Sequence, residues 1–225
     1  MHRAPLPHRV FLHGAGRRGT AAWPSQDPES GTFLGFPAGS SIRSQADALA
    51  ESARDREPIL FAHSIGAVTA VRAVAGGLRV SGLVLVEPAL YDVARGAAPI
   101  ERHIAVVTEA RSRATENDLY GFWALFRPLM FGGPLNHESW PDERAVAEHW
   151  ATANLPWGHG IRERSLAGVP TLVVTGGWNE EYEIIAGRLV DVGASHLVLP
   201  GFAHRPQDHP DFPAAVTAFE QSLTI

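Results

Sequence analysis

A single serine joins two apolar segments in the stretch LFAHSIGAV, residues 60–68. Small residues, Ala62 and Gly66, stand two positions before and two positions after Ser64. A sharp turn between a strand and a helix needs small residues there, because backbone atoms approach closely, and such a turn exposes the serine hydroxyl. A serine exposed in this way is a candidate nucleophile for acyl transfer. A serine that only caps the following helix is the alternative interpretation.

The serine lies within an alternation of apolar runs and helical periodicity. Short runs rich in Val, Leu and Ile are typical of strands buried on both faces of a parallel sheet. Strands that alternate with helices indicate an α/β fold with right-handed crossovers. The predicted strands are 9–12, 58–62, 82–86, 171–175 and 196–199, with a weaker one at 32–36, and the predicted helices are 41–54, 65–74, 181–192 and 213–223.

Residues 91–166 interrupt this alternation. They contain three predicted helices, at 99–114, 117–126 and 141–154, and four of the six tryptophans, Trp123, Trp140, Trp150 and Trp157. We expect this segment to be a helical lid over an apolar pocket, inserted into a core formed by residues 1–90 and 167–225. An ordinary helical subdomain with the tryptophans in its core is the alternative.

The strand, serine turn and helix resemble the α/β-hydrolase fold family, and VFLHGAG at residues 10–16 looks like that family's strand and His-Gly loop. The resemblance implies a three-layer fold with a mostly parallel sheet, shortened at the N-terminus to about six strands. It also implies that the backbone N–H groups of Ala15 and Ile65 form an oxyanion hole, worth roughly 3 kcal/mol per donor. His13 is expected to be structural, hydrogen-bonded beneath its loop.

Residues 199–223 resemble the family's terminal strand, catalytic histidine loop and closing helix. Ala203 and His204 stand where the family usually has Gly-His. By this resemblance His204 is the general base, a task that suits a side chain whose pKa lies close to neutrality. His209, five residues further on, is the local rival.

The carboxylate that would orient this histidine has more than one candidate. The family most often carries it after the strand that follows the lid, where this chain has the uncharged Asn179. Glu180 or Glu181 could serve from a shifted turn, although both also suit the acidic first turn of a helix. Some branches carry the acid at the end of the preceding core strand, where Glu87 ends the apolar run GLVLV. A buried glutamate at the end of a strand is costly unless it has a partner, and ligands bind at that edge of the sheet. Glu87 is therefore the predicted acid.

The composition excludes several classes of protein. Cysteine is absent, which excludes disulfides and thiolate chemistry, and the motifs require no metal and no organic cofactor. The net charge is -5 and no basic run occurs, so we expect no nucleic acid and no membrane as partner. Arg17 and Arg18 are expected to be solvated at a pocket rim. The start of the chain lacks the apolar region of a signal peptide, and a cytoplasmic location is expected.

Together these features predict a carboxylesterase-like serine hydrolase. Ser64 would attack an ester or related acyl compound of a small, largely apolar substrate through an acyl-enzyme, with a small molecule as the partner and homodimer formation left open. A ligand-binding protein without turnover stays an alternative, because Asn179 occupies the usual acid position. A C–C hydrolase or lyase of a small metabolite is another, because it would use the same geometry.

Overall fold

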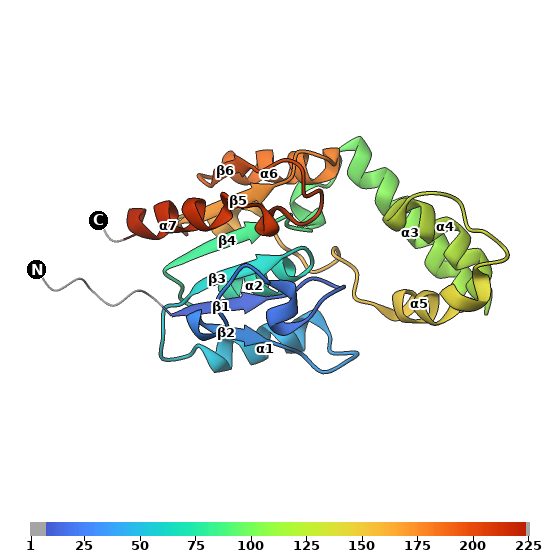
Figure 1. The fold of residues 1–225 in the computed structure, drawn as a ribbon, viewed down its shortest axis with the longest axis horizontal. Helices are drawn as coiled ribbons and strands as arrows, with labels where there is room; N and C mark the ends of the chain where they lie inside the picture. The colour runs from blue at the N-terminus through green and yellow to red at the C-terminus, as the bar shows by residue number, and fades with distance from the viewer. Residues whose placement is uncertain (1–7, 224–225) are drawn as a thin grey trace, which may run out of the picture. The chain divides into compact units, whose positions relative to one another are not determined.

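The computed structural model describes residues 8–223 of the 225-residue chain, which divides into two compact units (Figure 1). The first unit contains the chain up to Ala94 and again from Leu155, and the second unit is Arg95–Asn154. The second unit is shorter than the predicted insertion of residues 91–166, because the carboxylate of Asp92 accepts the N–H groups of Gly158 and His159, both at 2.8 Å. These bonds hold both flanks of the insertion within the first unit.

The first unit is built on a sheet of six strands in which every neighbouring pair is parallel. Its order is β2-β1-β3-β4-β5-β6, which confirms the predicted α/β fold with a shortened parallel sheet (Figure 1). Strands β3, β4 and β5 are buried at every residue, as their near-continuous apolar runs predict. The strands are β1 Arg9–Leu12, β2 Thr32–Leu34, β3 Ile59–His63, β4 Gly82–Val86, β5 Thr171–Thr175 and β6 Ser195–Val198.

Helices α1 Ile42–Ser52, α2 Gly66–Ala75, α6 Glu180–Val190 and α7 Phe212–Ser222 belong to the same unit. Alternate residues of a strand point to opposite faces of a sheet. Phe61 of β3 packs in one apolar cluster with Phe212 and Val216 of α7. The next residue, Ala62, points to the other face and is equally buried. Both faces of the sheet are therefore covered, which gives the predicted three layers.

An ion pair ties the first strand to the last helix. The Nε and Nη2 atoms of Arg9 donate to the two carboxylate oxygens of Glu220, both at 2.6 Å. The same guanidinium lies 5.8 Å from the ring centroid of Phe61. Because a bidentate pair fixes both distance and orientation, this contact holds α7 in register with β1.

The second unit consists of helices α3 Ala98–Thr115, α4 Leu119–Phe131 and α5 Trp140–Thr152. Trp123 is 2% exposed and packs 6.0 Å from the ring of Phe126, which in turn lies 5.4 Å from Trp150. Two of the four tryptophans predicted for this segment therefore lie in an aromatic core of the unit itself. Within residues 8–223, every helix is too short or too polar to cross a lipid bilayer.

Helix α4 continues five residues beyond the predicted end at residue 126, past Pro128. Proline usually ends a helix, because it lacks an N–H group and restricts the residue before it. Here the Nη1 atom of Arg127 donates to the carbonyls of Gly132, Gly133 and Pro134, at 2.9 to 3.2 Å. This side chain binds the carbonyls that follow the last turn, a stabilising contact that helical periodicity does not reveal.

Candidate active site

Two neighbouring strand ends bring Ser64 and Glu87 to one edge of the sheet. His63 of β3 pairs in register with Val86 of β4, and each strand is followed at once by one of the two residues. The Ser64 N–H donates to the Val86 carbonyl at 2.9 Å, and the Glu87 N–H donates to the Val174 carbonyl of β5 at 2.8 Å. The carboxyl edge of an open parallel sheet is where ligands bind in such folds.

The backbone at Ser64 has the sharp turn predicted from the small residues around it. Ser64 has a φ of 55°, in the left-handed region that costs a residue with a side chain about 1–2 kcal/mol. A Cβ atom at Gly66 would lie 2.7 Å from the carbonyl oxygen of His13, so glycine is required there. Ala62 stands in place of the first glycine of the motif and is accommodated inside strand β3.

The His-Gly loop lies directly against this turn. A Cβ atom at Gly14 would meet the Ser64 Cβ atom at 3.0 Å. Among residues 8–223, the backbone N–H groups of Ala15 and Ile65 donate to no backbone or side-chain acceptor. The Nδ1 atom of His13 lies 2.7 Å from the Gly14 carbonyl oxygen, which agrees with a structural role for that ring, and Arg17 and Arg18 next to the loop are exposed.

Glu87 is fully buried, with 0% of its surface exposed and a φ of 43°. Its Oε1 atom accepts the Gly176 N–H at 2.6 Å, and its Oε2 atom accepts the indole N–H of Trp178 at 3.1 Å. The same Oε2 atom lies 3.4 Å from the Nδ1 atom of His204. Hydrogen-bond donors on both oxygens offset the cost of burying this side chain.

The other acid candidates occupy different places. The side chain of Asn179 accepts the Glu181 N–H at 2.8 Å and so caps helix α6. Glu180 is exposed in the first turn of that helix, and Glu181 accepts the hydroxyl of Tyr91 at 2.5 Å. The side-chain hydrogen bond and the ion-pair contact of the His204 ring are instead with Glu87.

His204 follows β6 on a loop that interlocks with the loop after β5. Ala203, in place of the family's usual glycine, has a φ of 46°. A Cβ atom at Gly176 would lie only 2.2 Å from the Ala203 carbonyl oxygen, so only glycine lets the two loops meet. The rival His209 accepts the N–H of Asp211 at 3.1 Å. Its ring therefore stabilises the start of helix α7.

The structure does not join Ser64 to His204: no hydrogen bond between them occurs among residues 8–223. The ring of Tyr182 instead lies beside both residues, with its centroid 5.1 Å from that of His204. Burial and the negative charges of Glu87 and Glu181 raise the pKa of Tyr182, and hydrogen bonding to the Ser64 hydroxyl only partly opposes this rise. Tyr182 is therefore a neutral phenol at any ordinary pH.

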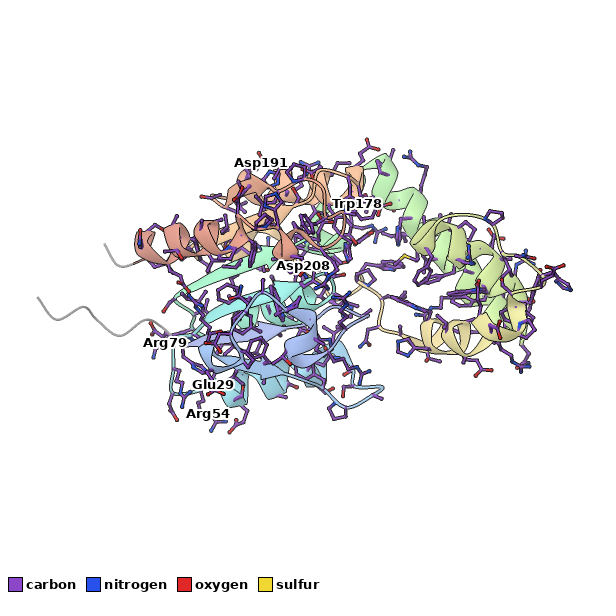
Figure 2. All side chains as sticks on the ribbon, viewed as in Figure 1. Glu29, Arg54, Arg79, Trp178, Asp191 and Asp208 are labelled. Carbon is purple, nitrogen blue, oxygen red and sulfur yellow. The ribbon has the colours of Figure 1, made fainter. Side chains whose placement is uncertain are left out.

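Sequence reasoning missed both Trp178 and Tyr182 as site residues. Trp178 stands in the loop that usually supplies the acid (Figure 2). Tyr182 lies in the first turn of α6, with 6.2 Å between the two ring centroids. The signal available in the sequence was that both residues flank Asn179, which stands where the acid is usually found. Their contacts with Glu87 and His204 depend on segments far apart in the chain, and no local pattern predicts them.

His63 links the serine turn to the histidine loop. Its Nε2 atom lies 2.8 Å from the His204 carbonyl oxygen, and the two imidazole rings are 4.8 Å apart. Because the carbonyl only accepts, Nε2 carries the proton. Burial lowers the pKa of His63 well below its usual value, and the nearby positive charge of His204 lowers it further. His63 is therefore a neutral donor that holds the His204 loop.

This lowered pKa predicts a loss of stability in mild acid. Below pH about 6.5 the unfolded chain protonates His63 while the folded chain does not, so stability present above this pH is lost as the pH falls. Between pH 7.5 and 5.5 the parent is expected to lose about 1.4 kcal/mol more free energy of unfolding than His63→Gln. Urea unfolding of both proteins at the two pH values measures this difference, and equal losses would contradict it.

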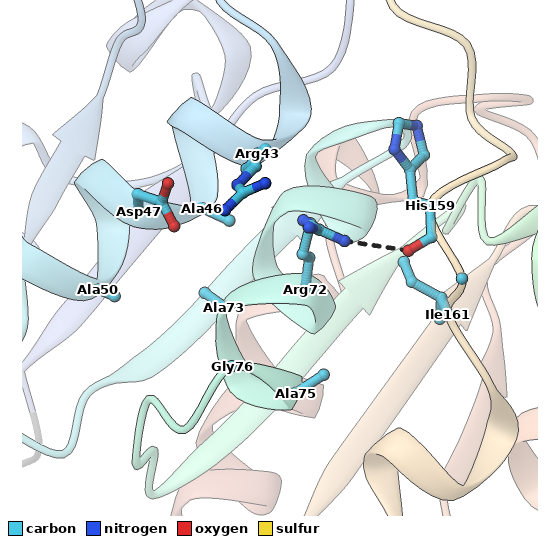
Figure 3. Close-up of a pocket in the computed structure, with 11 residues that line it drawn as sticks. Arg43, Ala46, Asp47, Ala50, Arg72, Ala73, Ala75, Gly76, His159 and Ile161 are labelled. Atoms are coloured by element: carbon cyan, nitrogen blue, oxygen red, sulfur yellow. Dashed lines mark hydrogen bonds between the residues drawn. The ribbon is translucent and has the colours of Figure 1, made fainter.

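A separate concavity of about 330 Å³ lies between α1, α2 and the segment around His159 (Figure 3). Arg72 donates to the His159 carbonyl oxygen there at 3.1 Å. None of Ser64, Glu87 and His204 lines it. Within residues 8–223, no group of three or more histidine, aspartate or glutamate side chains is arranged to hold a metal ion.

No protein-family model matches the chain, and no curated protein matches it in sequence. Solved structures do resemble it. MenH from S. aureus is 17% identical with a TM-score of 0.67, over 100% of this chain and 97% of that one. NosK from Streptomyces actuosus is 19% identical with a TM-score of 0.61, over 98% and 100%. A carboxylesterase structure from Nitrososphaera gargenis is 15% identical with a TM-score of 0.60, over 99% and 92%. Identities this low establish a shared fold and nothing finer.

Proposed function

Since the chain has the α/β-hydrolase fold, we propose that it is a serine hydrolase that acts on esters or related acyl compounds. The observation that carries the proposal is the juxtaposition at the carboxyl edge of the sheet. Ser64 stands in a strained turn after β3, and the buried Glu87 carboxylate lies 3.4 Å from the Nδ1 atom of His204. A serine, an imidazole and a carboxylate in this chain order are the parts of a Ser-His-acid triad.

In the proposed reaction, the Nε2 atom of His204 takes the Ser64 proton as the serine oxygen attacks the substrate carbonyl. Glu87 accepts a hydrogen bond from the Nδ1–H group of His204, stays ionised in this step and stabilises the imidazolium that forms. The N–H groups of Ala15 and Ile65 bind the oxygen that becomes negative. His204 then returns the proton to the leaving alcohol, and water releases the acid by the same steps in reverse order.

The Ser64 hydroxyl must turn from Tyr182 to His204 before the reaction. Catalytic hydrogen bonds are often unformed without substrate and tighten in the complex. The neutral phenol of Tyr182 and the ring of Trp178 both lie beside His204, so an acyl group bound there would meet aromatic side chains. These rings favour a small, largely apolar substrate, and the carboxylesterase among the similar folds supports the same class. The helical insertion stays a predicted lid.

The test is covalent labelling. A fluorophosphonate reacts with a serine only when a neighbouring base activates it, so the proposal expects stoichiometric labelling of the intact protein, located at Ser64 by peptide mass spectrometry. Ser195, an exposed serine at the start of β6, is the internal control and should stay unmodified. Absence of labelling over hours would instead favour a protein that binds its ligand without turnover.

A further inference from the structure

The indole of Trp178 holds the buried end of the candidate triad. We propose that Trp178 is a positioning residue that fixes the Glu87 carboxylate against His204, a role that rests on the proposed function. The indole Nε1 atom donates to Glu87 Oε2 at 3.1 Å, and this same oxygen lies 3.4 Å from the Nδ1 atom of His204. One carboxylate oxygen therefore serves both side chains.

Two donors are needed because the carboxylate of Glu87 rotates easily about the bond between Cγ and Cδ. The Gly176 N–H holds Oε1 at 2.6 Å, which leaves the direction of Oε2 to the second donor. The indole N–H supplies that donor, at 3.1 Å from Oε2. With both in place, Oε2 is held 3.4 Å from the Nδ1 atom of His204.

Trp178 lies at the surface and reaches a buried carboxylate. The residue Trp178 is 50% exposed, whereas Glu87 is 0% exposed, and the indole N–H points to the carboxylate. Its ring meets the His204 ring nearly edge to face, at 73° with 6.1 Å between centroids. The indole therefore contacts both the carboxylate and the imidazole.

The backbone around Trp178 is built to direct its side chain inward. Gly177 has a φ of 66°, a left-handed turn that glycine adopts without strain. Asn179 caps helix α6 immediately afterwards, which fixes the far side of the turn. In most chains of this fold the loop after β5 carries the acid. In this chain the same loop carries Trp178, which binds Glu87, an acid that follows β4.

Loss of the indole N–H has two consequences for catalysis. The carboxylate loses a fixed direction, so the Glu87 and His204 pair is less well aligned in the transition state. Without the indole N–H, the Glu87 carboxylate also keeps more of its negative charge, which favours protonated His204. The acid limb of the pH profile therefore moves to higher pH. A loss of alignment alone would weaken the stabilisation of the imidazolium and move the limb to lower pH, so an upward shift distinguishes the loss of the hydrogen bond.

The test compares Trp178→Phe with the parent in the rate of fluorophosphonate labelling of Ser64 and in kcat/KM for p-nitrophenyl acetate, both measured against pH. The expected result is about a tenfold loss at pH 7.5 and an acid limb about half a pH unit higher. Phe202→Leu, which removes an aromatic ring of similar exposure on the His204 loop, should match the parent. Thermal unfolding checks that each variant is folded.

A double-variant cycle with Glu87→Gln identifies the route of the effect. If Trp178 acts through the carboxylate, Trp178→Phe causes no further loss in the Glu87→Gln background. An equal loss in both backgrounds, or a Trp178→Phe protein with parental rates and an unmoved acid limb, would overturn the role while leaving the proposed function intact. A parent protein that the fluorophosphonate never labels would overturn both.

Discussion

Replacement of Ser64 by alanine is expected to lower kcat/KM for p-nitrophenyl acetate by about 10⁴-fold or more, because the acyl-enzyme route needs the serine oxygen. The fold should be retained, since the side chain is only partly buried and alanine occupies less space at the same backbone position. Initial rates over a range of substrate concentrations, with thermal unfolding of both proteins, measure the effect.

Ser195→Ala is the matched control for this change. Ser195 is an exposed serine outside the site, so its replacement should leave kcat/KM unchanged. A Ser64→Ala protein that hydrolyses the ester as fast as the parent would move the nucleophile elsewhere or exclude covalent catalysis. Fluorophosphonate labelling that persists in Ser64→Ala would identify that other nucleophile.

Replacement of Glu87 by glutamine is expected to lower kcat/KM by about 10³- to 10⁴-fold, because a neutral amide does not stabilise the imidazolium of His204. The amide NH₂ group would also face the N–H donors of Gly176 or Trp178, which now bind carboxylate oxygens at 2.6 and 3.1 Å. Steady-state kinetics give the activity, and urea unfolding gives any cost in stability.

Glu180→Gln is the matched comparison, with the same chemical change on an exposed residue of α6. It should keep the parental kcat/KM to within about twofold, as surface substitutions usually do. A fully active Glu87→Gln enzyme together with an inactive Glu180→Gln enzyme would reverse the assignment and return the acid to the loop after β5.

The fold could be predicted because each core strand repeats the same signal. The strands at 9–12, 82–86 and 171–175 coincide with β1, β4 and β5, since a strand buried on both faces must be apolar throughout. Strand β3 is displaced from its predicted range by one residue, because His63 extends it in register with Val86. Helix α4 exceeds its predicted length because side-chain contacts override the usual effect of Pro128.

The site could be predicted in part. Ser64 and His204 stand in motifs with local spacing, whereas the acid depends on contacts that spacing does not encode. The separation in sequence between Glu87 and its neighbours Gly176, Trp178 and His204 is about 90 residues or more. The sequence could narrow the acid to a few carboxylates, and of these candidates Glu87 lies 3.4 Å from the imidazole in the structure.

Three of the residues at this edge of the sheet, Ser64, Glu87 and Ala203, have left-handed backbone conformations. Glycine would adopt each of them at about 1–2 kcal/mol less, a large share of the 5–15 kcal/mol that stabilises an ordinary domain. Selection for heat resistance alone would therefore favour glycine at Ser64 and Glu87 and remove the hydroxyl and the carboxylate together. At Ala203 the same selection would restore the glycine usual in this fold without loss of a reactive group. To raise the thermal stability of the protein, the backbone strain can be relaxed at Ala203 but must be kept at Ser64 and Glu87.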